Sequence, residues 1–543
     1  MTPDPLYYLS NFKEAIAWVV ERNRDLLNAE ELAFVDQFTA LAVPAQALLV
    51  RLIMRRGDLF RRSRINYPEI GDCDCALAPL LELRWIDAEP GLPLDELFRL
   101  ATRKELALQF PVLRGRASKW EAYEQLSVRH NEIATFGQWM ASEEPVYRVR
   151  IASMVTRFRL LFFGTFHQEW SEFVLAQLGI FKFEQVEIDH DSRPFASRAD
   201  IDCFFALHTC REAFHSGASM SDVLWLFPEG GLETDWLLEH RERLRFRIGE
   251  ALERDDDVET ALLVYEECRY PEARVRRALI LERQGRYDEA AIVVQRALSD
   301  RPTEAEAQRL ERIAARLHKH QPDATKKRRR AVQSAMTFQL PSAPEVRVEL
   351  ALRDQLTREG APVFYVENSL ICSMFGLLCW EAIFQPVRGA FFHRFHRGPA
   401  DLASPDFEAR RRSTLERCLV RLDDGSHHDH LIKTFAAKFG TQSPFVHWHA
   451  LSEELLEVAL MCIRPRDIKL YCRRLLRGLS ENCTGLPDLI QFDLQQHSYK
   501  MIEVKGPGDR LQDNQRRWLN YCREHDLPME VCHVTWPAEL LAG

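Results

Sequence analysis

Residues 486–534 constrain the fold most, because strand-like and helix-like patterns follow one another there at short intervals. Two apolar, alternating runs at 489–492 and 499–505 predict a pair of strands joined by a polar turn. Gly and Pro residues end the second strand, and Asp509 is a candidate N-cap for a helix that runs to about residue 525. A last strand follows that helix. The C-terminal part of the chain is therefore expected to be an α/β domain.

Two acidic residues fall where a hairpin of these strands would bring them together. Asp488 follows Pro487 before the first strand, and Glu503 stands on the second. Carboxylates and a carbonyl such as that of Val504, where the chain turns, are oxygen ligands of the kind Mg²⁺ prefers. Lys505 shares a strand face with Glu503 and could orient water or neutralise phosphate charge. The pattern predicts metal-assisted phosphodiester hydrolysis; the alternative is a turn-forming Asp beside an exposed Glu–Lys ion pair.

The sequence around these residues resembles that of a known nuclease domain. The segments GLPDLIQFD and YKMIEVKGPGDRLQDNQRRWL resemble the VRR-Nuc domain of the PD-(D/E)-x-K superfamily, and within it the Fanconi-associated nuclease family. The resemblance implies a restriction-endonuclease-like fold. It also implies that Arg510 and Gln515 support the site by contacting phosphate or water, although Arg510 as an ordinary surface charge is the alternative.

The family supplies a third carboxylate from a helix upstream of this motif. The matching stretch is VENSLICSMFGLLCWE, in which Glu367 is our candidate and Glu381, at the far end, is the alternative. The family usually has Gly after this Glu, whereas this chain has Asn368. The resemblance implies that one or two Mg²⁺ or Mn²⁺ ions are bound by Glu367, Asp488, Glu503 and the Val504 carbonyl, and that the catalytic residues are Glu367, Asp488, Glu503 and Lys505.

The chain before residue 341 is expected to be mainly helical. Residues 91–135 resemble a SAP-type DNA-binding module, although a helix pair that merely packs on its neighbours is the alternative. Small residues and a closing Pro302 within 245–340 resemble a tetratricopeptide array, for which we favour a scaffold role. The expected order is a helical N-terminal domain (1–90), the SAP-like module (91–135), a helical linker or DNA-contact region (136–244), the tetratricopeptide-like array (245–340) and the VRR-Nuc nuclease domain (341–543).

Basic residues gather in short segments of the chain. For any single Arg, the solvated end of a core helix or strand is the alternative to a phosphate contact, which would supply affinity without sequence specificity. The block at 326–330 is either a solvated linker or a phosphate-gripping loop. The DNA-binding candidates are Arg61, Arg62, Lys119, Arg148, Arg157 and Arg159.

Charge and cysteine content limit the class of protein. The net charge of −9 argues against a protein that coats nucleic acid by bulk charge, but not against local basic patches. Thirteen scattered Cys without any C-x-x-C pair predict reduced thiols in a cytoplasmic protein, associated with the nucleoid if the source is bacterial. Neither an apolar run long enough to span a membrane nor a signal peptide is expected.

Clustered histidines are not expected to form a metal site. In His427–His430 three of four consecutive residues are His, and consecutive side chains point in different directions, whereas zinc ligands come in separated pairs. We expect a solvated helix start there. His447 and His449, on either side of Trp448, are expected to pack or to donate hydrogen bonds.

The resemblance implies a metal-dependent, structure-selective DNA nuclease that acts on branched or flapped double-stranded DNA. The expected activities are 5′ flap endonuclease and 5′-to-3′ exonuclease, in repair of interstrand crosslinks. Vertebrate relatives carry a ubiquitin-binding zinc finger, but no Cys/His pairs with the spacing of that finger occur here, so we expect no such finger. A monomer is the favoured oligomeric state. The alternatives are a Holliday-junction resolvase and a non-catalytic, helical-repeat DNA-binding adaptor.

Overall fold

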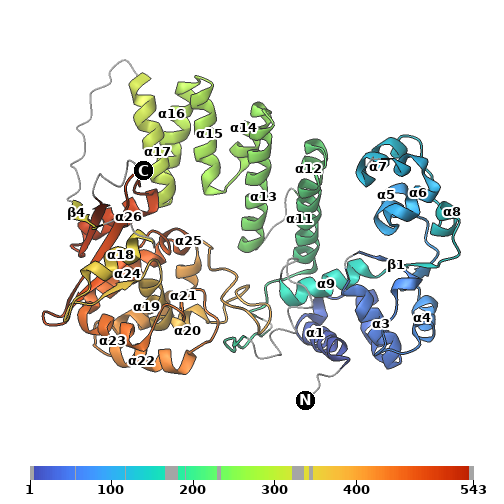
Figure 1. Ribbon diagram of the computed structural model, residues 1–543, viewed down its shortest axis with the longest axis horizontal. Coiled ribbons are helices and arrows are strands. Elements are labelled where there is room, and N and C mark those ends of the chain that lie inside the picture. Colours follow the sequence, from blue (N-terminus) through green and yellow to red (C-terminus); the bar gives the residue numbers. More distant parts are fainter. Residues whose placement is uncertain are drawn as a thin grey trace. The chain divides into compact units, whose positions relative to one another are not determined.

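The computed structural model describes residues 5–55, 57–115, 118–164, 181–189, 191–228, 234–320, 335–341 and 347–536. The chain divides into two compact units, Met1–Phe181 and Lys182–Gly543 (Figure 1). The boundary between the two units falls inside the segment 136–244, which the sequence predicts to be a single linker or DNA-contact region.

The first unit opens with amphipathic helices, each of which buries one side. In α1, Tyr8, Phe12 and Val19 recur at helical spacing and are buried. A three-stranded sheet with β3 in the middle and β1 and β2 antiparallel to it follows the helices. The sequence predicts mainly helix here, with helix and strand both open for the run that contains β3, because each strand spans just three or four residues. The elements are α1 (Tyr7–Asn23), α2 (Ala29–Ala40), α3 (Val43–Ile53), β1 (Leu59–Arg61), α4 (Cys73–Glu82), β2 (Ile86–Ala88), β3 (Val146–Val149) and α9 (Ala152–Phe163).

The predicted SAP-like module has its own apolar core within this unit, formed by residues such as Leu97, Phe98, Leu106 and Phe110. The pattern LDELFRLATRKELALQF predicts one helix over residues 94–110, but the structure has two helices there, because Thr102 caps a new one through a capping box. The elements are α5 (Leu94–Leu100), α6 (Arg103–Gln109), a 3₁₀ turn (Pro111–Arg114), α7 (Lys119–Ser127) and α8 (Phe136–Met140).

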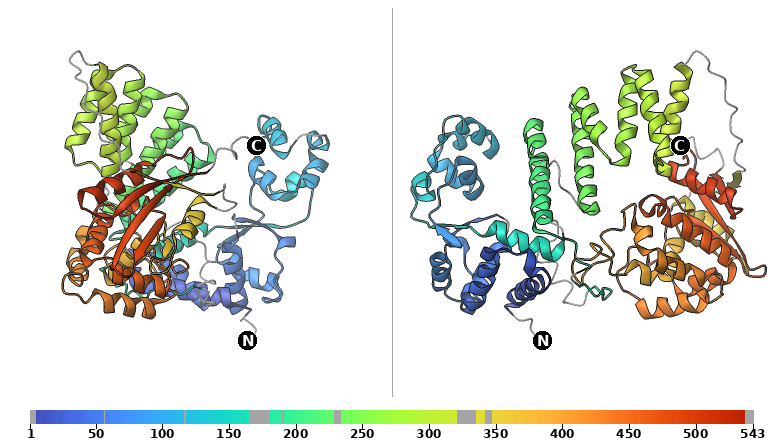
Figure 2. Two further views of the ribbon diagram at one scale, coloured as in Figure 1. Left: turned by 60° about the vertical axis from the view of Figure 1, so that its left-hand side comes forward. Right: turned by 180° about the vertical axis from the view of Figure 1, so that it is seen from behind.

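The second unit starts with a run of antiparallel helices that stand side by side (Figures 1 and 2). Small residues allow neighbouring helices to approach: a Cβ on Gly249 of α13 would lie 2.5 Å from the Tyr265 ring of α14. Helices occupy the range in which the sequence predicts the array, 245–340, but the run starts earlier, at α11, within the segment 136–244 that is expected to be a linker or DNA-contact region. Its elements are α11 (Arg198–Ser216), α12 (Met220–Leu226), α13 (Asp235–Arg254), α14 (Val258–Glu267), α15 (Pro271–Arg283), α16 (Tyr287–Ser299) and α17 (Glu304–Leu317).

A five-stranded mixed sheet in the order β4-β8-β7-β6-β5 organises the C-terminal domain. β7 is antiparallel to β6 and parallel to β8, and β5 closes one edge antiparallel to β6. β4 pairs parallel with β8, so the sheet begins before the boundary expected at residue 341. The strands are β4 (Ala335–Gln339), β5 (Val363–Tyr365), β6 (Leu489–Asp493), β7 (Ser498–Lys505) and β8 (Met529–Thr535).

Helices cover both faces of this sheet. On one face Leu352 of α18 packs with Ile502 and Val504 of β7. On the other face Tyr471 of α24 contacts Tyr499 of β7, and Trp518 of α26 is buried. The helices are α18 (Val348–Leu356), α19 (Leu370–Leu378), α20 (Trp380–Ile383), α21 (Phe407–Val420), α22 (His427–Lys438), α23 (Glu453–Cys462), α24 (Pro465–Leu476), α25 (Leu479–Asn482) and α26 (Asp513–Glu524).

The observed architecture confirms the expected fold class: a mainly helical N-terminal two-thirds, followed by an α/β nuclease-like domain. All thirteen cysteines are free thiols, and most are buried, as expected for small apolar side chains. Over the described part of the chain, no helix has the length and apolar character needed to cross a membrane.

Candidate active site

Three neighbouring strands bring the predicted acidic residues to one region of the sheet. Tyr365 of β5 pairs with Leu489 of β6, and Leu489 pairs with Ile502 of β7. Just beyond β5, the amide of Val366 donates to the carbonyl of Asp488 over 2.8 Å. Glu367 and Asp488 therefore lie on adjacent segments, and Glu503 follows on the next strand.

The Asp488 carboxylate is held directly against the strand that carries Glu503. Its Oδ2 accepts a hydrogen bond of 2.8 Å from the Val504 amide, which leaves the Val504 carbonyl as the predicted ligand atom. The chain segment that leads to Asp488 requires glycine at position 485. There φ is +84°, and a Cβ would lie 2.8 Å from the Asn514 backbone. Gly485 thus lets the Asp488 segment run close to the start of α26.

Burial makes the two central carboxylates hard to ionise. Burial raises the pKa of Asp488 to about 6, and the charges of Glu349 and Glu367 add to the effect, while the Val504 amide and Lys505 oppose it. Burial and the neighbouring Asp488 raise the pKa of Glu503 to about 7, against the ammonium group of Lys505. Two acids with raised pKa values at one strand edge are typical of a functional site.

The surroundings of Glu503 fit a divalent cation. Its side chain is completely buried, and neither oxygen accepts a hydrogen bond of ordinary geometry within the described residues. Within the part of the chain that the structure describes, its ion-pair partner is Lys505, whose Nζ lies 2.7 Å from Oε1 but off the direction of an aligned hydrogen bond. A fully buried carboxylate whose partner is a single ammonium group is costly to ionise, and a divalent cation would add further positive charge and the oxygen coordination that carboxylates favour.

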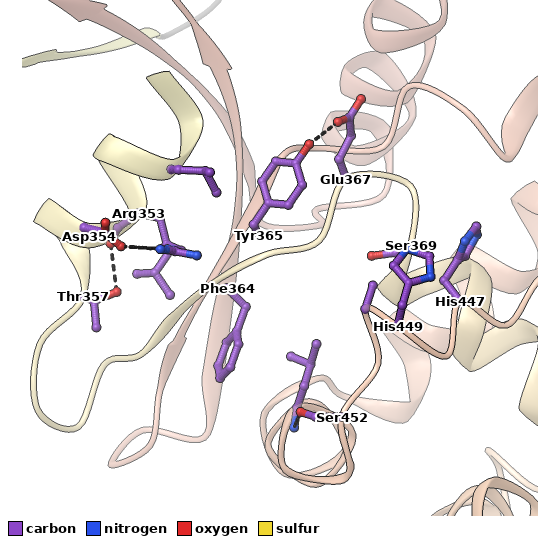
Figure 3. A pocket seen from close by; sticks show the side chains of 14 residues that line it. Arg353, Asp354, Thr357, Phe364, Tyr365, Glu367, Ser369, His447, His449 and Ser452 are labelled. Carbon is purple, nitrogen blue, oxygen red and sulfur yellow. Dashed lines mark hydrogen bonds and ion pairs between the residues drawn. The ribbon is translucent and has the colours of Figure 1, made fainter. Parts of the chain in front are cut away.

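Glu367 lies at the same edge but faces a different partner. Its carboxylate is exposed and accepts a hydrogen bond from the Tyr365 hydroxyl (Figure 3). Burial and this contact raise the pKa of Tyr365 to about 12. Across the described ranges, no three His, Cys, Asp or Glu side chains already converge as a metal-ligand group. For Glu367 to share an ion with Asp488 and Glu503, its side chain would have to turn away from Tyr365.

The departure from the family pattern at Asn368 has a structural reason. Asn368 has φ +53°, in the left-handed region where Gly is favoured and Asn is the best-tolerated alternative. Its side-chain oxygen also accepts a hydrogen bond from the Leu486 amide over 3.0 Å. The alternative acid, Glu381, is bound by Arg421 at 3.0 Å and by the Cys418 thiol. The structure therefore favours Glu367 over Glu381 for a role at this edge.

Glu349 is an acidic neighbour that the sequence did not single out. It stands in the first turn of α18, half-buried, and its charge raises the pKa of Asp488. A Glu in a first turn is usually explained by the helix dipole. No signal along the sequence indicates that α18 packs across β5, β6 and β7 and so brings this carboxylate toward Asp488.

The segment after β7 differs from the prediction. Asp509 does not cap a helix; its carboxylate accepts from the Gly506 amide within the turn. Gln512 is the N-cap of α26 instead, and its backbone N–H donates to the side-chain Oε1 of Gln515 over 2.9 Å, as in a capping box. The side-chain oxygen of Gln515 is thus engaged in capping the helix. Only its side-chain nitrogen remains available to contact phosphate or water at the site. Arg510 is exposed and has no ion-pair partner among the described residues.

Ion pairs inside the first unit occupy most of the predicted DNA-binding residues. Arg61 contacts Glu144 and Glu105, Arg62 contacts Asp74, Arg148 contacts Glu96, and Arg157 contacts Glu31. Lys119 donates to the Ala101 carbonyl at 2.8 Å and is half-buried, and Arg159 is also engaged within the protein. Because acidic partners offset these charges, the clustering of basic residues in the sequence overestimates how much positive charge the surface carries. Contact between these residues and DNA stays a prediction. The basic block 326–330 lies outside the described residues.

A cavity of about 750 Å³ opens beside Glu367 (Figure 3). It lies between α18, β5 and the segment 447–455, and both His447 and His449 line it. His427 begins α22, as expected, although its own side chain is buried rather than solvated. The pKa of His447 is lowered by burial and by the nearby His449 and Arg397.

Family models match three parts of the chain. The model of the "FAN1, HTH domain" matches residues 6–87, that of the "Fanconi anemia-associated nuclease SAP domain" matches residues 91–139, and that of the "VRR-NUC domain" matches residues 422–536. The last range contains Asp488, Glu503 and Lys505, whereas Glu367 lies upstream of it.

Whole-chain relatives decide the family. The chain is 44% identical to the Fanconi-associated nuclease 1 homolog of Pseudomonas aeruginosa, over 98% of this chain and 96% of that protein. The chain belongs to the Fanconi-associated nuclease family. The homolog of Arabidopsis thaliana is 25% identical over 99% of this chain and 68% of its own length, and the human Fanconi-associated nuclease 1 is 29% identical over 31% of this chain and 17% of its own length.

Solved structures agree with this family assignment. The chain is similar to paFAN1 bound to 2-nucleotide 5′ flap DNA with a gap, with a TM-score of 0.91 and 44% identity over 99% of this chain and all of that one. A second structure, with a 1-nucleotide flap, has a TM-score of 0.90 over 98% of this chain and all of that one, also at 44% identity. As a member of the Fanconi-associated nuclease family, this chain is a DNA nuclease, which hydrolyses phosphodiester bonds.

Proposed function

We propose that this chain is a divalent-metal-dependent, structure-selective nuclease that cuts 5′ flaps and degrades DNA from the 5′ end. The observation that carries the proposal is the buried Glu503, which has no aligned hydrogen-bond donor, between Asp488 and Lys505. A structural ion pair alone would leave Glu503 Oε2 without compensation inside the protein. A site that binds a cation and a phosphate explains why two acids and a lysine are kept together there.

The residues of the cluster have distinct roles in this proposal. Asp488, Glu503 and the Val504 carbonyl would hold Mg²⁺ or Mn²⁺, and Glu367 would join them after leaving Tyr365. Such a cation polarises phosphate and lowers the pKa of water. Lys505, at the edge of the cluster, orients the attacking water and offsets charge on the phosphate. Arg510 and the amide nitrogen of Gln515 are proposed to contact phosphate.

The substrate class rests on relatives and on the chain's helical parts. The paFAN1 structures contain 5′ flap DNA, and this chain is similar to paFAN1 over its whole length. Branched DNA is recognised by shape and backbone contacts rather than by sequence, which suits a SAP-like module and a helical array beside a nuclease domain. We infer a role in DNA repair, including repair of interstrand crosslinks.

A cleavage assay on branched DNAs tests the proposal. End-labelled 5′ flap, 3′ flap, nicked and four-way DNA are incubated with the chain and Mg²⁺, Mn²⁺ or EDTA. We expect cutting of the 5′ flap above the others, only with metal, and a loss on the order of 100-fold or more in Lys505→Ala. Preferred, symmetric nicking of the four-way junction would instead favour the resolvase alternative.

The matched control for Lys505→Ala is Lys500→Ala. Lys500 stands on the same strand but on the opposite face, where it pairs with Glu530 at 2.7 Å. We expect this variant to cut like the parent. Equal losses in both variants would mean that damage to β7, and not chemistry at Lys505, explains the effect.

A further inference from the structure

Two cysteines connect the segments that carry Glu367 and Asp488. Cys372 stands in α19, shortly after Glu367, and Cys483 follows α25, shortly before Asp488. The Cys372 thiol lies 3.8 Å from the Cys483 carbonyl oxygen and is hydrogen-bonded to the Cys483 thiol. The two thiols are therefore neighbours in the fold, although 111 residues separate them in the chain.

The segment of Cys483 is positioned by contacts on two sides. The Asn368 side chain accepts a hydrogen bond of 3.0 Å from the Leu486 amide. The indole N–H of Trp518 lies 3.2 Å from the carbonyl oxygens of the residues directly before and after Cys483. Asp488 belongs to the same segment, so a change at Cys483 is passed on to the proposed catalytic cluster.

The two thiols differ in access to solvent. Cys483 is partly exposed, whereas Cys372 is only 2% exposed. Contact with the Cys483 thiol and burial raise the pKa of Cys372, which keeps that thiol protonated at neutral pH. Because a dissolved oxidant reaches Cys483 and not Cys372, Cys483 is the thiol that reacts first.

A second pair of cysteines has the same proximity without the access. The thiols of Cys379 in α19 and Cys418 in α21 are also hydrogen-bonded to each other, and both side chains are 0% exposed. Cys418 Sγ lies 3.3 Å from a carboxylate oxygen of Glu381 as well. This pair is an internal control, because it should stay reduced when an oxidant meets the folded chain.

We propose that Cys372 and Cys483 form a peroxide-sensitive dithiol, and that its oxidation to a disulfide slows DNA cleavage. The Cys483 thiolate attacks one oxygen of hydrogen peroxide, the O–O bond breaks, and a sulfenic acid and water result. The Cys372 sulfur then attacks the Cys483 sulfur, the S–O bond breaks, and the leaving hydroxide takes the thiol proton as a second water. Two thiols are oxidised and one peroxide is reduced.

The disulfide would disturb the segment that carries Asp488. A disulfide bond holds its sulfur atoms much closer together than hydrogen-bonded thiols lie. All residues of α19 are buried, so the adjustment falls on the partly exposed segment of Cys483. A displacement of about 1 Å in a reacting group can lower a rate by about 100-fold. The effect on cleavage rests on the proposed function, whereas formation of the disulfide does not.

Peptide mapping tests the modification itself. The reduced full chain is treated with hydrogen peroxide, the peroxide is removed with catalase, remaining thiols are blocked, and the digest is analysed by mass spectrometry. We expect a disulfide between Cys372 and Cys483, with Cys379 and Cys418 recovered as blocked thiols. Absence of the Cys372–Cys483 disulfide from the oxidised, folded chain would overturn the inference.

Cleavage of a 5′ flap by the same samples tests the consequence. The oxidised parent should cut at least about tenfold more slowly than the reduced parent, and dithiothreitol should restore the rate. Cys483→Ser should cut like the reduced parent before and after peroxide. The matched control is Cys75→Ser, which removes an exposed thiol of the first unit and should be inactivated like the parent.

The two proposals fail in different ways. A parent that does not cut flaps when reduced, or that cuts them in EDTA, contradicts the proposed function, while peptide mapping still decides whether the dithiol exists. A disulfide that leaves the cleavage rate unchanged, or equal inactivation of Cys483→Ser by peroxide, overturns the inference about the dithiol. Circular dichroism of each sample shows that slower cutting is not caused by unfolding.

Discussion

Much of the free-energy cost of ionising the site arises at one side chain, that of Glu503. Its pKa rises from 4.5 to about 7, mainly because the carboxylate is buried, and the folded state therefore binds its proton more tightly than the unfolded state. The stabilising contribution of that proton is complete below pH 4.5 and is lost as the pH rises through 7. Holding Glu503 ionised thus lowers the stability of the metal-free protein at neutral and alkaline pH.

We predict that Glu503→Gln stabilises the metal-free protein at pH 8 by up to about 3 kcal/mol and has little effect at pH 5. Thermal unfolding in EDTA across this pH range measures the difference. Glu381→Gln is the control, because Arg421 and Cys418 hold the pKa of Glu381 below its usual value in spite of burial. Parallel pH profiles for the parent and Glu503→Gln would contradict the prediction.

Asn368 shows how one residue both follows and departs from a family pattern. Its left-handed backbone explains why Gly is usual there, and its hydrogen bond to the Leu486 amide explains why Asn serves as well. We expect Asn368→Gly to cost about 1 kcal/mol from the lost hydrogen bond, and Asn368→Ala about 2 kcal/mol because backbone strain is added. Urea unfolding measures both; equal costs would show that strain plays no part.

At the scale of elements, helix α17 of the array is joined to α24 and α26 of the nuclease domain. Glu304 of α17 pairs with Arg474 at 2.8 Å, and that guanidinium is buried against the Trp518 and Tyr521 rings. Arg312 of the same helix makes an exposed pair with Asp513 at the start of α26, at 2.6 Å. The array therefore contacts the helix that follows the strand carrying Lys505.

We predict that Glu304→Ala destabilises the protein by about 2 kcal/mol, because it leaves the buried Arg474 charge unpaired. Arg312→Ala should cost less than about 1 kcal/mol, since both members of its ion pair with Asp513 are exposed. Comparing the unfolding midpoints of the two variants in urea tests this order. A larger cost for Arg312→Ala would show that the exposed pair holds the junction.

The sequence predicts short-range features of the site and misses long-range ones. The alternation of side chains along a strand is sufficient to predict that Glu503 and Lys505 share one face of β7. The Pro487-Asp488 pair lies directly before β6, as the sequence predicts. The contact of Tyr365 with Glu367 and the approach of Glu349 depend on how α18 and β5 pack against β6 and β7. Pairs such as Arg61 with Glu144 join residues far apart in the chain, so basic spacing alone cannot show that a charge is already paired.

At the scale of the whole molecule, the net charge of −9 is compatible with a nuclease because the site needs local chemistry and not bulk charge. The order of a SAP-like module, a helical array and a C-terminal nuclease domain was predictable from patterns and resemblance. The division into units at residues 181 and 182 was not, because contacts between distant segments define compactness. We propose that DNA cleavage by the whole chain depends on a cation held at Asp488 and Glu503.

Removal and restoration of metal test that claim most directly. The full chain is stripped with chelator, and cutting of an end-labelled 5′ flap is measured as Mn²⁺ or Mg²⁺ is added back, for the parent and for Asp488→Asn, with circular dichroism as a check on folding. We predict that the parent is inactive when stripped and regains activity with metal, while a folded Asp488→Asn stays inactive at every metal concentration. Cutting by the stripped parent, or parent-like cutting by Asp488→Asn, would contradict the account.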